Sequence, residues 1–290
     1  MEKLFFLISM VIAVSLSGCT SECSDCGCDD CGESGSGNLE LIRDWSALLP
    51  DMERPEEVDV YLYHPELSPR HEVTYSDVSR YDVAPGCYEV LAVNRQDAAL
   101  FRGMDNYYTA EVCLPTHTRD SCVIVEEAPL LLFDRTAVKV GDKQSRCTVV
   151  PTPFIKTIHF SIRIHRQGDV REITMCCGRL DGVLTSAKIC VRQQDRFSAF
   201  LDFNTRKEGT DLFTKTVTLL GMTPTASHKL KLELTDESGR IRETGVVTGK
   251  LDFFDTSVLN CHIELNITGT GMEVGIVDWE PGGVGDIVLQ

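Results

Sequence analysis

The feature that most constrains the fold of this chain is an alternation of apolar and polar side chains with a period of two. The clearest run spans residues 157–164, and residues 58–64, 196–203 and 228–235 repeat the pattern. Successive side chains of a β-strand point to opposite faces, so each run predicts a strand with one face in the core and one in solvent. The apolar positions are Val58, Val60, Leu62, Ile158, Phe160, Ile162, Ile164, Phe197, Ala199, Leu201, Phe203, Leu230, Leu232 and Leu234.

Turn-forming residues separate the alternating runs along the body of the chain. They are Pro85-Gly86, Gly141-Asp142, Gly168-Asp169, Asp181-Gly182 and Glu237-Ser238-Gly239. Proline and glycine supply the backbone angles that tight turns need, so this punctuation favours many short strands. No stretch of the body keeps a helical period over three turns. We therefore predict an all-β fold made of antiparallel sandwiches.

The chain is long enough for more than one domain. It has 290 residues, whereas domains most often hold about 100–150 residues. Pro151 and Pro153 mark the expected boundary, because proline cannot donate a backbone hydrogen bond within a central strand. We expect one β-sandwich over residues 39–152 and a second over residues 153–290.

The first residues have the pattern of an export signal. Residues 1–3 (Met-Glu-Lys) carry charge and residues 4–16 are almost wholly apolar. This arrangement is typical of a secretory signal peptide, and the run is too short to cross a bilayer with margin. The next residues, Leu-Ser-Gly-Cys, resemble a bacterial lipobox that ends at Cys19. We expect residues 1–18 to be removed and Cys19 to carry acyl chains, several of which would hold the chain firmly in a membrane.

Residues 19–38 form a segment rich in cysteine and acidic side chains. Cys23, Cys26, Cys28 and Cys31 have the spacing C-x2-C-x-C-x2-C, and four thiolates can hold a zinc ion or an iron–sulfur cluster. However, only one residue separates the two pairs, whereas structural zinc sites usually place a small fold between them. The segment also ends in a Gly/Ser linker. We therefore predict a flexible acidic tether and no metal.

Charge and motif content exclude several functions. The chain has 44 acidic and 28 basic side chains, a formal net charge of −16, which repels phosphate backbones and excludes nucleic-acid binding. The sequence has no nucleophile elbow, no zinc-protease motif and no phosphate-binding loop. We predict no catalytic residue, no metal and no cofactor, and we do not expect an enzyme.

The body of the chain contains eight further cysteines. Sequence cannot choose among their possible disulfide pairings, and buried free thiols are the alternative. Cys176 and Cys177 are adjacent, so on a strand they face opposite sides and at most one lies in the core. The eight are Cys87, Cys113, Cys122, Cys147, Cys176, Cys177, Cys190 and Cys261.

Four motifs follow one another along the body of the chain. They are Arg43-Asp44-Trp45 with the strand at 58–64, the Pro-Gly-x-Tyr turn and strand at 85–94, Gly178–Gly182 with Leu180 as a buried plug, and the closing strand at 269–279. Taken in this order, they resemble the fimbrillin-like lipoproteins of Bacteroidetes, in particular their anchor and minor-subunit branch. The acidic residues close behind Cys19 (Glu22, Asp25, Asp29 and Asp30) also resemble the surface-export signal of Bacteroidetes lipoproteins.

This resemblance implies two tandem transthyretin-like β-sandwiches behind the lipidated tether. It also implies a lipid-anchored outer-membrane protein, exposed at the cell surface, that anchors or accompanies a fimbria-like assembly. Polymerising members of the family lose an N-terminal segment and accept a strand from a neighbouring subunit by β-strand addition, whereas anchor members keep the lipid. Fimbrial subunits are therefore the expected partners. The sequence leaves open whether a terminal strand near Ile287–Leu289 is donated or kept.

A second hypothesis is a tethered glycan-binding surface lipoprotein. Such a protein needs exposed aromatic rings on which sugars stack. Trp45 and Trp279 are the only tryptophans. The tyrosines at positions 61, 63, 107 and 108 could contribute to a platform, although tyrosines on strand faces more often pack within the sheet.

Overall fold

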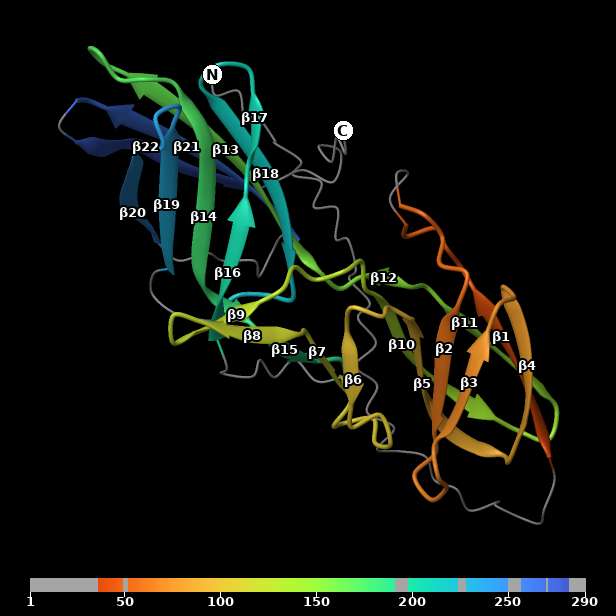
Figure 1. The fold of residues 1–290 in the computed structure, drawn as a ribbon. Coiled ribbons are helices and arrows are strands. Elements are labelled where there is room, and N and C mark those ends of the chain that lie inside the picture. The colour runs from red at the N-terminus through yellow and green to blue at the C-terminus, as the bar shows by residue number, and fades with distance from the viewer. Residues whose placement is uncertain are drawn as a thin grey trace, which may run out of the picture. The chain divides into compact units, whose positions relative to one another are not determined.

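Every element of the computed structural model is a β-strand (Figure 1). The structure describes residues 36–48, 52–190, 198–223, 228–249, 257–269 and 271–281. These ranges contain 22 strands and no helix. Among the residues that the structure describes, no helix is long and apolar enough to cross a membrane. The prediction of an all-β fold is confirmed.

Two sheets enclose the first core. Their strand orders are β11-β1-β4 and β12-β10-β5-β2-β3. Side chains from both sheets form one apolar cluster that includes Leu41, Leu62, Tyr81 and Val90. The strands are β1 (Gly37–Arg43), β2 (Val58–Tyr63), β3 (Arg70–Thr74), β4 (Val78–Val83), β5 (Gly86–Asn94), β10 (Leu132–Val140), β11 (Gln144–Val149) and β12 (Thr152–Pro153).

Two larger sheets enclose the second core. Their orders are β17-β18-β13-β21-β22 and β20-β19-β14-β16-β9-β8. Phe160 of one sheet stacks on Phe203 of the other, with ring centroids 4.8 Å apart. The strands are β8 (Thr116–Arg119), β9 (Cys122–Val125), β13 (Lys156–Arg166), β14 (Ile173–Leu184), β16 (Ser198–Asn204), β17 (Arg206–Glu208), β18 (Leu212–Leu219), β19 (His228–Asp236), β20 (Ile241–Gly249), β21 (Val258–Ile267) and β22 (Met272–Pro281).

A third, three-stranded sheet has the order β15-β7-β6. Its strands are β6 (Leu100–Arg102), β7 (Glu111–Cys113) and β15 (Ser186–Lys188), so it joins segments from both halves of the chain. In the same way β9 pairs with β16 of the second sandwich although it precedes β10 of the first. The boundary expected at residues 152–153 stays a prediction.

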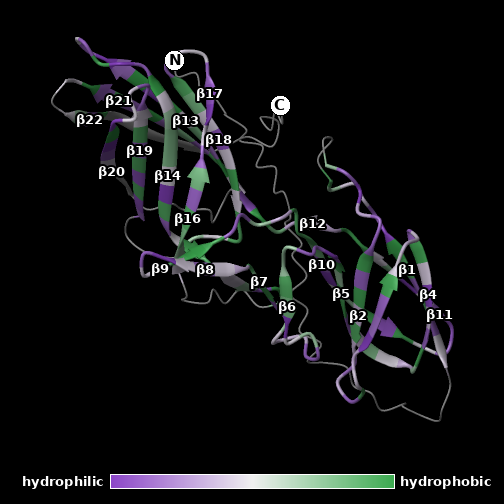
Figure 2. Cartoon of the chain, in the orientation of Figure 1, coloured by the Kyte–Doolittle hydropathy of each residue, from purple (hydrophilic) through white to green (hydrophobic). Residues whose placement is uncertain are grey.

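The period-two runs form the predicted strands, and the hydropathy colouring alternates along β19 (Figure 2). In β13 the side chains of Ile158, Phe160, Ile162 and Ile164 are all at most 2% exposed. Leu230, Leu232 and Leu234 of β19 are fully buried. Phe197 lies outside the described residues, but Ala199, Leu201 and Phe203 are buried as expected.

The prediction of a solvent-facing side is wrong for β2. Val58, Val60 and Leu62 are buried, but Asp59 and Tyr63 on the other face are also buried. Residues from distant parts of the chain cover this second face. The His71 ring lies 2.6 Å from the Asp59 carboxylate, and the ring of Tyr107 packs edge-on against Tyr63.

One predicted turn is instead a β-bulge. Asp181-Gly182 lies inside β14, where the pairing with β16 shifts register between Leu180 and Val183. Gly182 has a φ of +76°, which L side chains rarely adopt, and a Cβ there would come within 2.4 Å of the His228 Nδ1 atom. The other predicted turns fall between strands, except that Gly86 is already the first residue of β5, and the chain reverses at Gly168 and Gly239 with positive φ.

The buried imidazole of His228 beside this bulge predicts a loss of stability in acid. Its side chain is 1% exposed, and burial lowers its pKa despite the Asp181 carboxylate 3.8 Å away. As the pH falls below about 6.5, the unfolded chain takes up a proton that the folded chain takes up only at lower pH, so the free energy of unfolding decreases. Thermal unfolding followed from about pH 8 to about pH 5 measures this slope.

A His228→Gln variant is expected to show a shallower fall in thermal midpoint than the wild type over the same range. The matched control is His262→Gln, because His262 is exposed on β21. An equal slope in the wild type and both variants would contradict the prediction.

Candidate functional site

The residues that the sequence predicts as the anchor lie outside the described part of the structure. These are the signal peptide, Cys19 and the cysteines at positions 23, 26, 28 and 31. The segment at Ile287–Leu289 and the side chain of Trp279 also lie outside it. The lipidation site, the tether and the role of the terminal strand therefore stay predictions. What the structure does describe is the strand into which the tether leads.

That strand, β1, lies in the middle of its sheet. It pairs antiparallel with β4 and parallel with β11, which follows it by about a hundred residues. The inward side chains Leu39 and Leu41 are fully buried. Burying a leucine contributes about 1.5–3 kcal/mol. The first described strand is therefore an integral part of the first sandwich.

The outward face of β1 carries a buried carboxylate. Glu40 is 5% exposed because long side chains from both neighbouring strands cover it. Its Oε2 accepts hydrogen bonds from the Arg80 Nε and Nη2 atoms at 3.1 and 3.0 Å, and its Oε1 accepts one from the Arg146 Nε atom at 2.9 Å. The Gln144 amide donates a further bond at 3.0 Å. The two guanidinium groups hold the pKa of Glu40 below its usual range, so the carboxylate stays ionised.

Trp45 lies just beyond the end of β1 and is held in place by three polar residues. Its indole N–H donates to the Asp77 carboxylate at 2.8 Å. The guanidinium carbons of Arg54 and Arg43 lie 5.3 and 6.0 Å from the ring centroid. The hydrogen bond and the two cation–π contacts fix the position of the Trp45 ring, so its role at this end of the sandwich is structural.

The four tyrosines of the glycan hypothesis do come together, with His71 at one end. The ring of Tyr61 stacks on that of His71 at 4.4 Å and lies 6.2 Å from that of Tyr63. Tyr107 packs edge-on against both Tyr63 and Tyr108. Tyr61 and Tyr63 belong to β2, whereas Tyr107 and Tyr108 lie in the turn between β6 and β7. Tyr63 is buried and the rings of Tyr61 and Tyr107 are partly buried, so of these four tyrosines Tyr108 alone, 66% exposed, has an open ring. A single exposed ring is less than the row of rings that a stacking platform needs.

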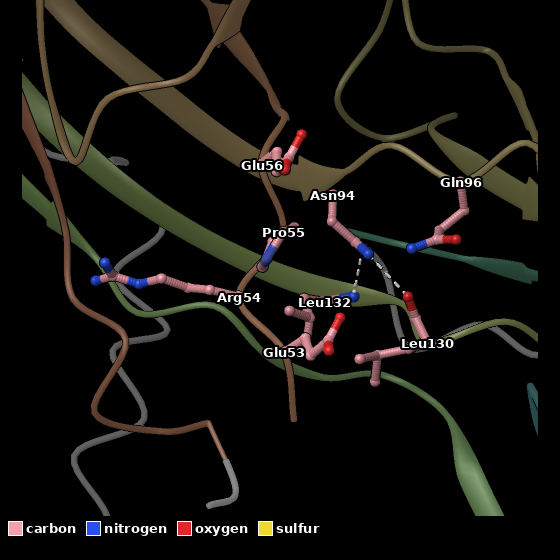
Figure 3. A pocket seen from close by; sticks show the side chains of 8 residues that line it. All are labelled: Glu53, Arg54, Pro55, Glu56, Asn94, Gln96, Leu130 and Leu132. Carbon is pink, nitrogen blue, oxygen red and sulfur yellow. Dashed lines mark hydrogen bonds between the residues drawn. The ribbon is translucent and has the colours of Figure 1, made fainter. Parts of the chain in front are cut away.

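A shallow hollow of about 390 Å³ lies where β5 ends (Figure 3). The Asn94 side chain donates to the Leu130 carbonyl at 2.8 Å and accepts from the Leu132 amide at 2.7 Å, so it fastens the segment that enters β10. The lining carries charges of both signs and no nucleophile–base pair. It is formed by Glu53, Arg54, Pro55, Glu56, Asn94, Gln96, Leu130 and Leu132.

The thiols of the body are mostly buried. Burial raises the pKa of Cys176 and of Cys190 to about 12 and that of Cys147 to about 11, so these thiols stay protonated and unreactive. The prediction for the adjacent pair is confirmed: Cys176 is fully buried and Cys177 is partly buried on the opposite face. Among the residues that the structure describes, no three metal-binding side chains converge.

Comparison with solved structures relates the fold to known proteins. A candidate adhesin from Bacteroides ovatus matches with a TM-score of 0.61 and 16% identity, over 84% of this chain and 99% of that chain. The fimbrial anchor protein Mfa2 from Porphyromonas gingivalis matches with a TM-score of 0.52 and 10% identity, over 85% of this chain and 98% of that chain. The chain has the fold of this candidate adhesin and of the fimbrial anchor protein Mfa2.

A third solved structure that matches this chain is a candidate polysaccharide-binding protein from Bacteroides thetaiotaomicron. Its TM-score is 0.52 at 11% identity, over 85% of this chain and 98% of that chain. No family model and no curated protein matches the sequence. The resemblance to fimbrillin-like proteins is confirmed by the fold, which the chain shares with the candidate adhesin and with Mfa2.

The motifs that carry the resemblance occupy defined places in the adhesin fold. The Pro85-Gly86 turn leads into β5, which ends at Asn94 as expected. Leu180 is fully buried within β14, as a plug of the second core. The closing strand is β22, which pairs antiparallel with β21. Sequence reasoning missed the Glu40 cluster, which consists of Glu40, Arg80, Gln144 and Arg146. An isolated glutamate between two leucines has the pattern of a solvent-facing strand residue.

Proposed function

We propose that this chain is a non-enzymatic surface lipoprotein of the outer membrane that serves as an anchor or accessory subunit of a fimbria-like assembly. The observation that carries the proposal is the fold, which matches a fimbrial anchor over 85% of the chain. The lipobox at Cys19 adds the means of attachment. Acyl chains at Cys19 would hold the protein in the membrane, and the tether would lead directly into β1.

The position of β1 supports an anchor in preference to a polymerising subunit. In the family that the sequence resembles, polymerising members lose their N-terminal segment and accept a neighbour's strand. Here the lipid site lies before β1 in the chain, so a molecule that stays attached through Cys19 also keeps β1. Its place between β4 and β11 is then filled by the chain itself. Partner subunits would pair with another strand edge by β-strand addition.

We expect the protein, extracted from outer membranes in mild detergent, to carry a polymeric partner with it. Main-chain hydrogen bonds between strands depend little on ionic strength, so the complex should survive high salt. Affinity capture of a tagged chain, followed by mass spectrometry, provides the measurement. The control is an equally tagged, unrelated lipoprotein from the same membranes. Recovery of this chain alone under mild extraction would count against the proposal.

Glycan binding is the less supported function, because the tyrosines pack on one another and Trp45 is held by arginines and Asp77. A glycan array distinguishes the two functions. Clear hits that Tyr107→Ala abolishes and Tyr75→Ala does not would reverse the ranking. Tyr75 is the matched control because its side chain is 72% exposed and lies outside the ring cluster.

A further inference from the structure

Strand β1 is where any tension on the N-terminal segment would enter the folded part of the chain. The segment that precedes it runs from the predicted lipid site at Cys19 to Gly37, the first residue of β1. At the other end of the neighbouring strand, β11 continues after Val149 through β12 into β13 of the second sandwich. Tension between a membrane anchor and the chain that follows Val149 would therefore pull β1 at its start and β11 at its end.

The pairing of these two strands sets how they respond to that tension. They are parallel, with six residue pairs in register from Asn38 opposite Gln144 to Arg43 opposite Val149. The Asp44 amide extends the pairing by donating to the Val149 carbonyl at 2.8 Å. Because parallel strands pulled from opposite ends slide along each other, all their hydrogen bonds are loaded together and none is peeled off first.

The Glu40 cluster reinforces this pair at its middle. The carboxylate binds Arg146 and Gln144 on β11 and Arg80 on β4, so β1 is tied to both neighbours through charge-assisted hydrogen bonds. Sliding β1 by even one residue would take Glu40 away from both arginines. It would also move Leu39 and Leu41 out of the core, since a one-residue slip exchanges the two faces of a strand.

We propose that β1 and β11, joined by Glu40, form the mechanical clamp that bears tension between the membrane anchor and the body of the protein. The clamp rests on the proposed lipid attachment at Cys19. It adds a role for β1: the strand carries load, and Glu40 sets the rate at which β1 slides out of its sheet.

The test is single-molecule unfolding of the mature full-length chain at constant force, with one handle at its N-terminal end and the other at position 150, directly after β11. Glu40→Gln is expected to raise the rate of the first unfolding event by about 10-fold or more, because forced unfolding is governed by the unfolding rate and the variant removes charged hydrogen bonds. The matched control is Asp59→Asn. Asp59 is an equally buried carboxylate, 5% exposed, but it lies on β2 in the other sheet.

The clamp is supported only if Glu40→Gln speeds the first event and Asp59→Asn leaves it within about 2-fold of the wild type. Equal rates in all three proteins, or an equal increase in both variants, would overturn it. If Glu40→Gln fails to fold, Arg146→Lys keeps the charge but loses donors and takes its place. Absence of a fimbrial partner would not change these rates, so failure of the clamp and failure of the proposed function are distinguishable.

Discussion

Replacing Cys19 with serine is expected to abolish the lipid modification of the protein and the attachment to membranes that depends on it. A serine hydroxyl cannot take the thioether-linked lipid, and no other cysteine of the chain follows a Leu-Ser-Gly sequence. Without that lipid, the precursor should keep its signal peptide or be released uncleaved. Membrane fractionation of cells grown with labelled palmitate measures both attachment and label; the label should fall to background, and any protein left in the membrane fraction should be the unlabelled, uncleaved precursor.

The matched control for this experiment is Cys122→Ser. Cys122 is a half-buried thiol of the body, and its replacement should leave membrane attachment and label unchanged. Both variants should unfold at nearly the wild-type temperature, since position 19 lies before β1 and Cys122 is only partly buried. If Cys19→Ser protein still enters the membrane fraction and takes up label, the lipoprotein assignment is wrong, and the anchor role falls with it.

Truncation of Leu180 to alanine is expected to lower the free energy of unfolding by about 2–5 kcal/mol, the usual cost of a cavity left by a buried leucine. Leu180 is fully buried in β14, and its register partners on the two flanking strands are Leu201 and Leu230, which are at most 1% exposed. Neighbours held in paired strands cannot collapse into the space. Urea unfolding of the wild type and the variant measures the difference.

Met175→Ala serves as the control on the same strand. Met175 is 46% exposed, so its truncation should change stability by about 0.5 kcal/mol or less. An equal decrease in the free energy of unfolding for the two variants would show that Leu180 is not a plug of the core. The Gly178–Gly182 motif would then no longer mark a buried core position.

Local pattern was enough to predict the strands whose two faces differ. In β13 and β19 the alternation alone marks the buried side, and the facing of Cys176 and Cys177 follows from the same rule. These predictions succeed because burial on one face is decided within the strand itself. The turn residues also place most of the reversals, as at Gly168 and Gly239.

What the sequence could not show depends on partners that are distant in the chain. Asp59 is buried because His71 and Arg95 lie beside it. Glu40 is buried because Arg80 and Arg146 reach it across 40 and 106 residues. No local pattern indicates that such a carboxylate is covered. The bulge at Gly182 shows the same limit, since the Asp181-Gly182 pair has the composition of a turn whether or not the strand continues through it.

The crossing of strands between the two halves has a consequence for how the protein can be divided. A fragment that begins at residue 153 would lack β8 and β9, which complete one edge of the six-stranded sheet, and would leave β16 with an open edge. A fragment that ends at residue 152 would lack β15, the pairing partner of β7. Each half expressed alone would therefore present unpaired backbone to its surroundings, which favours aggregation. Recombinant material for crystallisation or antibody production should span both halves.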